Sequence, residues 1–262
     1  YPSLILYSSL VMREMYICFF LLLAFYNIIN WSRTGSIKSF FFVILSFIGG
    51  AIFHGGIYIG LIVFIFFAIY KNSKKTLNNL IKGNVNFKVL LFFIVFIFSV
   101  TYLFSNNITI PKIGNVTNID ILKKEILKKN LVSHRGNAKY PDWVTAKSEK
   151  ELIYKIPLKG IYLMFSPLPW DIKNAGHFLG FFDGLFFMLM VYFIFKNRKV
   201  IFSDPALKII LFTLIGFVLV YGVATGNFGT AFRHRTKFVA IFILLSAPLL
   251  PKLIFRKKNE HR

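Results

Sequence analysis

The chain has 262 residues, of which 56% are hydrophobic and only 16% are charged, and its formal net charge is +22. Long apolar runs recur along the whole length. This composition excludes a soluble globular domain and predicts an all-α, polytopic integral membrane protein. The Lys and Arg residues lie mainly in short clusters between the apolar runs, as topology signals do, so we do not expect nucleic acid as a partner.

The ends and the single cysteine carry further information. Cys18 lies inside an apolar run, which excludes an internal disulfide and a cysteine-based metal site. The chain opens on Tyr1 and shows no basic leader with a cleavage site. We therefore expect it to be the carboxy-terminal part of a longer protein.

Five apolar stretches are each close to the 20 residues that cross a bilayer. They cover residues 12–29, 87–104, 175–195, 207–223 and 237–250, the last of which is short and is expected to begin near Thr230. With the intervening stretch 39–70, the sequence predicts about six to seven transmembrane helices.

The stretch 39–70 is too long for one transmembrane span and is short for two spans. It contains Gly49-Gly50 and then His54-Gly55-Gly56. Glycines allow a turn and close packing, and a histidine at the tip stays near water. These residues predict a tight helical hairpin that turns near His54, and the alternative is one long tilted helix with a kink.

Clusters of Lys and Arg mark one side of the membrane, which we expect to be cytoplasmic. Counting spans returns all of these clusters to the same face if the hairpin exists, and it places the carboxyl terminus inside. The clusters comprise Arg33, Lys38, Lys71, Lys74, Lys75, Lys82, Lys196, Arg198, Lys199, Lys252, Arg256, Lys257 and Lys258.

The opposite, outer face receives Arg13, Glu14, His54, the long segment 105–173 and the turn 226–235. The predicted organisation is therefore a transmembrane part over 1–104, an outer loop over 105–173, and three transmembrane helices with a basic tail over 174–262. The outer loop includes a predicted amphipathic helix over 119–131, whose apolar residues face the bilayer and whose lysines face the headgroups. Alternatively, that helix is only a solvated helix lying on the membrane.

Two further motifs of the outer loop carry candidate residues. Ser133-His134-Arg135-Gly136-Asn137 is polar, and either binds an anion through Arg135 or is an ordinary surface loop. The stiff run Ser166-Pro167-Leu168-Pro169-Trp170-Asp171 either caps the next span at the interface or presents Trp170 for stacking on a sugar.

The strongest candidate is Arg233-His234-Arg235, at the mouth of the last apolar stretch. Three such side chains in a row are costly to desolvate, so they need an anionic partner or a wet cavity. Snorkelling explains one cation but not two that flank a histidine. For Arg13 with Glu14, and for His54, an interfacial ion pair and a hydrogen-bonded turn residue are the simpler alternatives.

The opening pattern P-S-x-x-x-x-S-S-x-x-x-R-E over 2–14 leads into a span. It is followed by a glycine-broken segment with a histidine, a large outer loop and a late Arg-His-Arg. This order resembles the bacterial O-antigen polymerase and ligase type of polysaccharide-assembly membrane proteins.

The resemblance implies many transmembrane helices, a periplasmic catalytic cavity in the bacterial inner membrane, and glycans carried on undecaprenyl pyrophosphate. The family's usual ten or more spans exceed the number counted here. Essential arginines and a histidine of such a site would correspond to Arg13, Arg135, Arg233, His234 and Arg235.

The chemistry of such a transfer requires charge neutralisation on the pyrophosphate and a base for the attacking sugar hydroxyl. Arginine forks suit pyrophosphate oxygens, so Arg233, Arg235 and Arg13 are expected to line one anion pocket. His234, His54 and Glu14 are equally plausible as the base. The sequence encodes no Asp-x-Asp or His-x-x-x-His pattern, so we expect neither a metal nor another cofactor.

Other functions remain open at this point. The same arginines would serve a transporter or flippase of lipid-linked glycan or another anion, or a noncatalytic membrane subunit that holds anionic glycan or lipid. Acyltransferases and glycosyltransferases with acidic first-loop motifs are further alternatives. Enzymatic activity as a polymerase or ligase, with other polysaccharide-assembly proteins as partners, is the preferred interpretation.

Overall fold

The computed structural model describes residues 13–81, 109–110, 114–115, 124, 127–128 and 138–247, and for 72–81 it describes the backbone alone. Most of these residues are helical, as the all-α class predicts. A two-residue antiparallel pair, β1 (Thr109–Ile110) and β2 (Gly114–Asn115), accompanies the helices. The expected span 87–104 and the basic tail after residue 247 lie outside the described residues.

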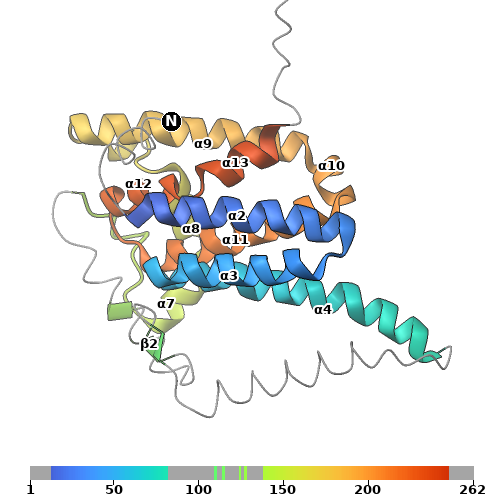
Figure 1. Ribbon diagram of the computed structural model, residues 1–262. Coiled ribbons are helices and arrows are strands. Elements are labelled where there is room, and N and C mark those ends of the chain that lie inside the picture. Colours follow the sequence, from blue (N-terminus) through green and yellow to red (C-terminus); the bar gives the residue numbers. More distant parts are fainter. Residues whose placement is uncertain are drawn as a thin grey trace, which may run out of the picture.

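The helices form a bundle in which the axes of α2 (Arg13–Thr34), α3 (Ile37–Phe53), α9 (Ala175–Lys196) and α11 (Pro205–Ala224) lie roughly parallel in the view of Figure 1. In chain order the elements are α2 (Arg13–Thr34), α3 (Ile37–Phe53), the 3-10 turn η1 (Gly55–Ile57), α4 (Tyr58–Ile81), α7 (Glu149–Tyr154), α8 (Ile156–Phe165), the 3-10 turn η2 (Pro169–Asp171), α9 (Ala175–Lys196), α10 (Arg198–Ser203), α11 (Pro205–Ala224), α12 (Phe228–Thr236) and α13 (Val239–Ser246).

Three helices of the described ranges, α2, α9 and α11, are long and apolar enough to cross a membrane. They match the predicted stretches 12–29, 175–195 and 207–223. The apolar segments Ile37–Phe53, Gly55–Lys71 and Ile156–Phe165 are shorter. The bundle therefore has the character of a membrane protein, in agreement with the composition.

The helical hairpin predicted near His54 is present. α3 ends at Phe53, His54 is extended with φ −157° and ψ 112°, and the chain then turns through η1 into α4. Figure 1 shows α4 running back along α3. The alternative of a single kinked helix is excluded, because the backbone leaves the helical conformation completely at His54.

The last predicted span, 237–250, is interrupted in the structure. α12 ends at Thr236 and α13 begins at Val239, so Lys237 lies at a junction between two short helices. The Lys237 side chain is fully buried. The stretch was predicted as one span because its composition is apolar, but a buried lysine requires polar partners and the helix breaks where they lie.

Close backbone contact between α8 and α11 explains one pair of glycines. A side chain at Gly222 would place its Cβ 2.9 Å from the backbone N of Gly160. Only glycine fits such a crossing, since a backbone cannot rotate away as a side chain can.

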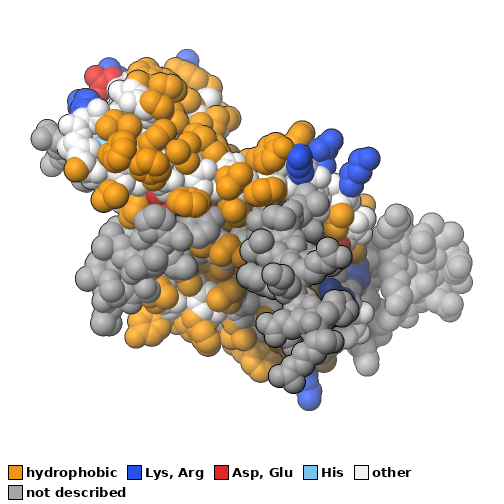
Figure 2. Space-filling model, turned by 90° about the horizontal axis from the view of Figure 1, so that it is seen from above, with side chains coloured by type: hydrophobic (Ala, Val, Ile, Leu, Met, Phe, Trp, Pro, Cys, Tyr) orange, Lys and Arg blue, Asp and Glu red, His pale blue; other side chains and the backbone are white. Residues whose placement is uncertain are grey.

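Much of the outer surface is hydrophobic. Large apolar side chains are exposed along α2 and α9, among them Phe19, Tyr26, Leu179 and Phe195. Among the described residues in Figure 2, hydrophobic side chains predominate and Lys and Arg stand in small groups. Exposed apolar surface of this extent is expected where lipid, rather than water, is the neighbour.

The outer-face candidates that are described gather at one end of the bundle, where α2 begins and α3 ends. At the other end, Lys71 Nζ donates a hydrogen bond to the carbonyl oxygen of Ser32 at 3.3 Å and lies over the Trp31 ring. Lys71, a member of one of the basic clusters, and the described site candidates thus lie at opposite ends of the bundle.

Candidate functional site

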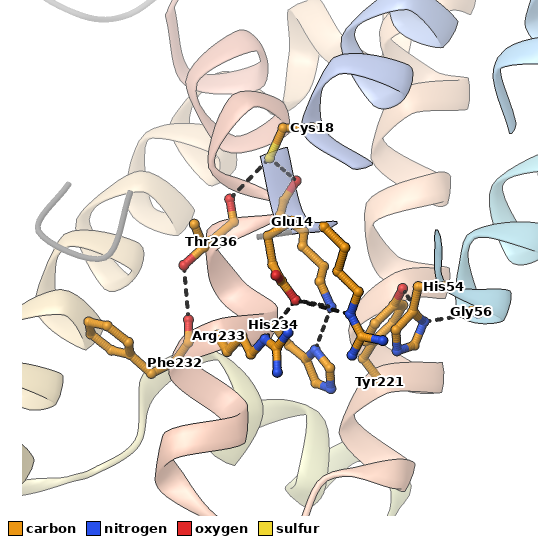
Figure 3. A network of polar contacts seen from close by, with 11 residues as sticks. Glu14, Cys18, His54, Gly56, Tyr221, Phe232, Arg233, His234 and Thr236 are labelled. Atoms are coloured by element: carbon orange, nitrogen blue, oxygen red, sulfur yellow. Dashed lines mark hydrogen bonds and ion pairs between the residues drawn. The ribbon is translucent and has the colours of Figure 1, made fainter. Parts of the chain in front are cut away.

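Glu14, in the first turn of α2, is the centre of a buried polar cluster (Figure 3). Its Oε1 lies 2.6 Å from Arg233 Nε, 3.5 Å from Arg13 Nε and 3.8 Å from Lys237 Nζ. Glu14 and Lys237 are fully buried, whereas the side chains of Arg13 and Arg233 each retain 34% exposure. We call Glu14, Arg13, Arg233, Lys237 and His234 the Glu14 cluster.

The charges of the Glu14 cluster do not cancel. Three cations, Arg13, Arg233 and Lys237, surround one carboxylate, so with neutral histidine the formal charge is 3 − 1 = +2. Excess positive charge in a partly desolvated site favours an anionic ligand. The two partly exposed arginines are the groups that such a ligand reaches first.

Local structure explains how the cluster is assembled. A carboxylate in the first turn of α2 and cations in the last turn of α12 both suit the helix dipoles. α12 begins at Asn227, whose side chain accepts a hydrogen bond from the Thr230 amide at 2.7 Å. One turn after Glu14, the Cys18 thiol packs on the carbonyl oxygens of Thr236 and Lys237. The start of α2 is thereby held on the α12–α13 junction.

A histidine and tyrosine network adjoins the cluster. The Gly56 amide donates a hydrogen bond to His54 Nδ1 at 3.2 Å, and Tyr221 Oη lies 2.9 Å from the same nitrogen. The His54 ring stacks on Tyr221 at 4.7 Å and lies 5.5 Å from the ring of His234. A Cβ at Gly56 would come within 2.7 Å of the Tyr221 ring, so this position requires glycine.

These contacts distinguish the three candidates for the base. A backbone amide can only donate, so His54 Nδ1 is an acceptor and the neutral ring carries its hydrogen on Nε2. His234 Nδ1 lies 2.8 Å from Lys237 Nζ, and a charged ammonium imposes the same tautomer. Glu14 Oε2, by contrast, is buried and accepts no hydrogen bond from the described residues. Glu14 is therefore the candidate that can still accept a proton.

Arg235 does not join Arg13 and Arg233, contrary to the expectation of one shared pocket. Its side chain is fully buried, and its Nε lies 3.3 Å from Asp183 Oδ2 of α9. Arg235 Nη1 also donates to the carbonyl oxygens of Met164 and Ser166, at 3.0 and 2.8 Å. Arg233 and Arg235 are two positions apart on α12 and therefore point about 200° apart around the helix axis. This separation directs Arg235 into the protein.

No protein-family model, curated protein or solved structure matches this chain. The assignment of the site therefore depends on its geometry and chemistry.

The other predicted site residues have different outcomes. Trp170 is largely exposed in η2, and its Nε1 donates to Tyr162 Oη at 3.4 Å. Arg135 lies outside the described residues, as does most of the amphipathic helix expected over 119–131, of which Lys124 and Lys128 are helical.

Several residues of the site were not predicted. Lys237 and Asp183 both lie inside apolar stretches, and an ionisable residue in such a stretch is itself a signal of function or of a buried partner. Lys159, also buried, donates to the carbonyl oxygen of Thr225 at 2.7 Å. Tyr221 carried no signal in the sequence, since an aromatic residue in an apolar helix is ordinary.

The described residues offer no group of three His, Cys, Asp or Glu side chains arranged to hold a metal ion. What the Glu14 cluster can do chemically is bind an anion through arginines and move a proton through a carboxylate.

Proposed function

We propose that this chain is a membrane glycosyltransferase of the polymerase or ligase type, which transfers a glycan from undecaprenyl pyrophosphate to a glycan acceptor in O-antigen or exopolysaccharide assembly. The observation that carries the proposal is the Glu14 cluster, in which three cations surround one carboxylate and two arginines reach the surface. The resemblance of the sequence pattern to the polymerase and ligase type supports the same function.

Arg13 and Arg233 bind the pyrophosphate in this proposal. Guanidinium forks bind phosphate oxygens in a bidentate manner, and such bonds are stronger away from bulk water. Both arginines already contact Glu14, so the carboxylate orients them before the ligand arrives. Their charge stabilises the pyrophosphate as it departs, which is the largest electrostatic requirement of the reaction.

Glu14 acts as the general base. The acceptor hydroxyl gives its proton to Glu14 Oε2 while its oxygen forms the new bond to the anomeric carbon of the donor. The bond from that carbon to the pyrophosphate oxygen breaks, and its electron pair leaves with undecaprenyl pyrophosphate. His54 and His234, which carry hydrogen on Nε2, donate hydrogen bonds to sugar or phosphate oxygens rather than accept a proton.

The proposal includes an orientation. The Glu14 cluster faces the periplasm of a bacterial inner membrane, six to seven helices of this chain cross the bilayer, and the carboxyl terminus is cytoplasmic. The separation of the site from the basic end of the bundle, where Lys71 and Arg198 lie, supports this arrangement.

Complementation tests the function in a strain that lacks its own polymerase or ligase, with surface glycan read on a gel. Variants Arg233→Ala and Arg233→Lys are compared with Arg198→Ala, an exposed arginine at the opposite end. We expect the wild type and Arg198→Ala to restore polymer, whereas Arg233→Ala accumulates lipid-linked precursor in the periplasmic leaflet.

Two other results would replace the proposal. Precursor that accumulates in the cytoplasmic leaflet identifies a transporter or flippase. Normal polymer in every variant at matched expression identifies a noncatalytic subunit, in which the cluster is structural.

A further inference from the structure

A pocket lies at the amino-terminal end of α12. Its volume is about 270 Å³, and its aromatic lining comes from Tyr140, Trp143, Trp170 and Phe228. We call it the tryptophan pocket. Phe228 precedes Arg233 on α12 by five residues, or about 7.5 Å along the helix axis. The tryptophan pocket is thus a neighbour of the Glu14 cluster, and one helix contributes to both.

Backbone pairing forms one wall of the tryptophan pocket. The Tyr140 amide donates to the carbonyl oxygen of Gly226 at 2.9 Å, and the Phe228 amide donates to that of Ala138 at 2.8 Å. Lys139 and Asn227 form an antiparallel bridge between these two bonds. The other wall is η2, which follows Ser166, the residue whose carbonyl oxygen accepts from Arg235.

Tyr162, buried beneath the tryptophan pocket, positions the aromatic lining. Its ring meets Trp143 edge to face at 5.3 Å and meets Tyr140 at the same distance, and its hydroxyl accepts the hydrogen bond from Trp170 Nε1. Trp143 and Trp170 nevertheless stay 54% and 68% exposed. Each indole is fixed at one edge and open elsewhere.

A membrane-interface tryptophan directs its N–H toward the headgroups. The N–H of Trp170 is instead satisfied inside the protein, so its exposure has another purpose. Charged groups stand beside the indoles, since Lys139, Asp171 and Lys173 also line the tryptophan pocket. Flat apolar surface next to ammonium and carboxylate groups is complementary to a pyranose ring, which has C–H faces and hydroxyl edges.

We infer that the tryptophan pocket is a saccharide subsite, in which one pyranose ring stacks on Trp143 or Trp170 and its hydroxyls bond to Lys139, Asp171 or Lys173. This inference rests on the proposed function, and it places a glycan unit beside the pyrophosphate site.

Tryptophan fluorescence of the purified chain in lipid nanodiscs tests the inference. The probes are tetramers of glucose, N-acetylglucosamine and galacturonic acid. The chain has three tryptophans, and Trp31 is buried at the far end of α2. We expect at least one tetramer to change the emission in a saturable manner, and the Trp31→Phe variant to preserve the change.

Variants then locate the binding. Trp143→Ala or Trp170→Ala should raise the dissociation constant of that tetramer roughly tenfold. Trp170→Phe should retain most of the affinity because a phenyl ring still stacks. Tyr154→Ala removes an equally exposed aromatic side chain of α7, outside the tryptophan pocket, and should have no effect. Melting temperatures close to the wild type show that the variants are folded.

The subsite and the proposed function can fail separately. No saturable change with any of the three tetramers, or binding that persists unchanged in both alanine variants, overturns the subsite and leaves transfer at the Glu14 cluster standing. Saturable binding that depends on Trp143 or Trp170, together with normal polymer in Arg233→Ala cells, supports the subsite and overturns the proposed transfer.

Discussion

Asp183 of α9 and Arg235 of α12 form an ion pair in which neither side chain reaches solvent, with Oδ2 and Nε 3.3 Å apart. Arg235 also binds the carbonyl oxygens at the end of α8 and before η2. One guanidinium therefore links α8, α9 and α12. Arg235 therefore stabilises the packing of these helices, although it lies next to the Glu14 cluster in the sequence.

Replacing Asp183 with Asn should strongly destabilise the protein, because it leaves a buried guanidinium without its counter-charge. Losses of about 3–5 kcal/mol in the free energy of unfolding are typical of such changes. The measurement is the temperature at which half of the protein stays monodisperse after heating in detergent. Glu151→Gln breaks the more exposed pair with Lys155 and should change that temperature little.

A double variant tests the same ion pair independently. Asp183→Leu combined with Arg235→Met replaces both charges by apolar groups, and should recover part of the stability that Asp183→Asn loses. If Asp183→Asn melts like the wild type, the ion pair does not stabilise the fold.

Glu14→Gln should separate ligand binding from transfer. The change keeps the shape of the side chain but removes the one carboxylate among Arg13, Arg233 and Lys237, which raises the formal charge of the cluster from +2 to +3. We expect inorganic pyrophosphate to bind several-fold more tightly, since the competing anion is gone. Transfer should fall at least a hundredfold, as general-base removal typically costs.

Isothermal titration with pyrophosphate and a gel assay of polymer measure these two effects. Arg233→Ala is the matched opposite, with weaker pyrophosphate binding and lost transfer. A Glu14→Gln variant with normal polymer formation excludes Glu14 as the base and returns the role to His54 or His234.

Gly222→Val should disrupt the crossing of α8 and α11. Its Cβ would lie 2.9 Å from the backbone N of Gly160, and neither backbone can move without displacing a helix. The expected result is loss of the monodisperse peak in detergent gel filtration. Gly229→Ala is the control, because a Cβ there makes only an ordinary contact at 3.8 Å with the Asn227 side chain.

Much of this fold follows from local patterns in the sequence. Apolar length predicts α2, α9 and α11, and the glycines around His54 predict the reversal between α3 and α4. Charge placement also separates the basic end from the end that holds Glu14 and Arg233. These features depend on residues that are close together in the sequence and on the thickness and sidedness of the bilayer. Apolar length, glycines and charge placement in the sequence are therefore enough to predict them.

The different roles of Arg233 and Arg235 within Arg233-His234-Arg235 could not be predicted in the same way. Whether an arginine binds a ligand or an internal carboxylate depends on which partner the tertiary fold brings to it. Arg233 meets Glu14, which is 219 residues away, and Arg235 meets Asp183. The break at Lys237 has the same origin, because its burial beside Glu14 follows from packing and not from the composition of the stretch.

Cysteine labelling should assign the two ends of the bundle to two sides of the membrane. Lys173→Cys lies near the tryptophan pocket and Lys38→Cys lies near the start of α3, and both positions are exposed. The single native cysteine, Cys18, is buried and should give little background. We expect a membrane-impermeant maleimide to label position 173 in cells with a permeable outer membrane, and position 38 only after the inner membrane is opened.

Labelling of both positions from the same side contradicts the predicted topology. In that topology α2 and α3 cross the membrane, so the end of the bundle with position 173 and the end with position 38 lie on opposite sides. Labelling from opposite sides in the reverse order preserves the fold but places the Glu14 cluster in the cytoplasm. The proposed periplasmic transfer is then wrong.

Stability should depend on pH through Asp171, which lines the tryptophan pocket and is the last residue of η2. Burial raises the pKa of this carboxyl above its usual value, although the Leu168 amide that donates to Oδ2 opposes the shift. The folded state therefore binds this proton more readily than the unfolded state. The resulting stabilisation is complete below the unfolded pKa of 3.8 and disappears as pH rises through the raised folded value.

Asp171→Asn removes that titration but keeps an oxygen that can accept from the Leu168 amide. The melting temperature of the wild type minus that of Asp171→Asn should accordingly increase as pH falls from 7 to 4, and the other carboxyls cancel because both proteins share them. A difference that decreases toward acid pH means that the Asp171 carboxylate is stabilised in the folded state, and that a charged partner outweighs its burial.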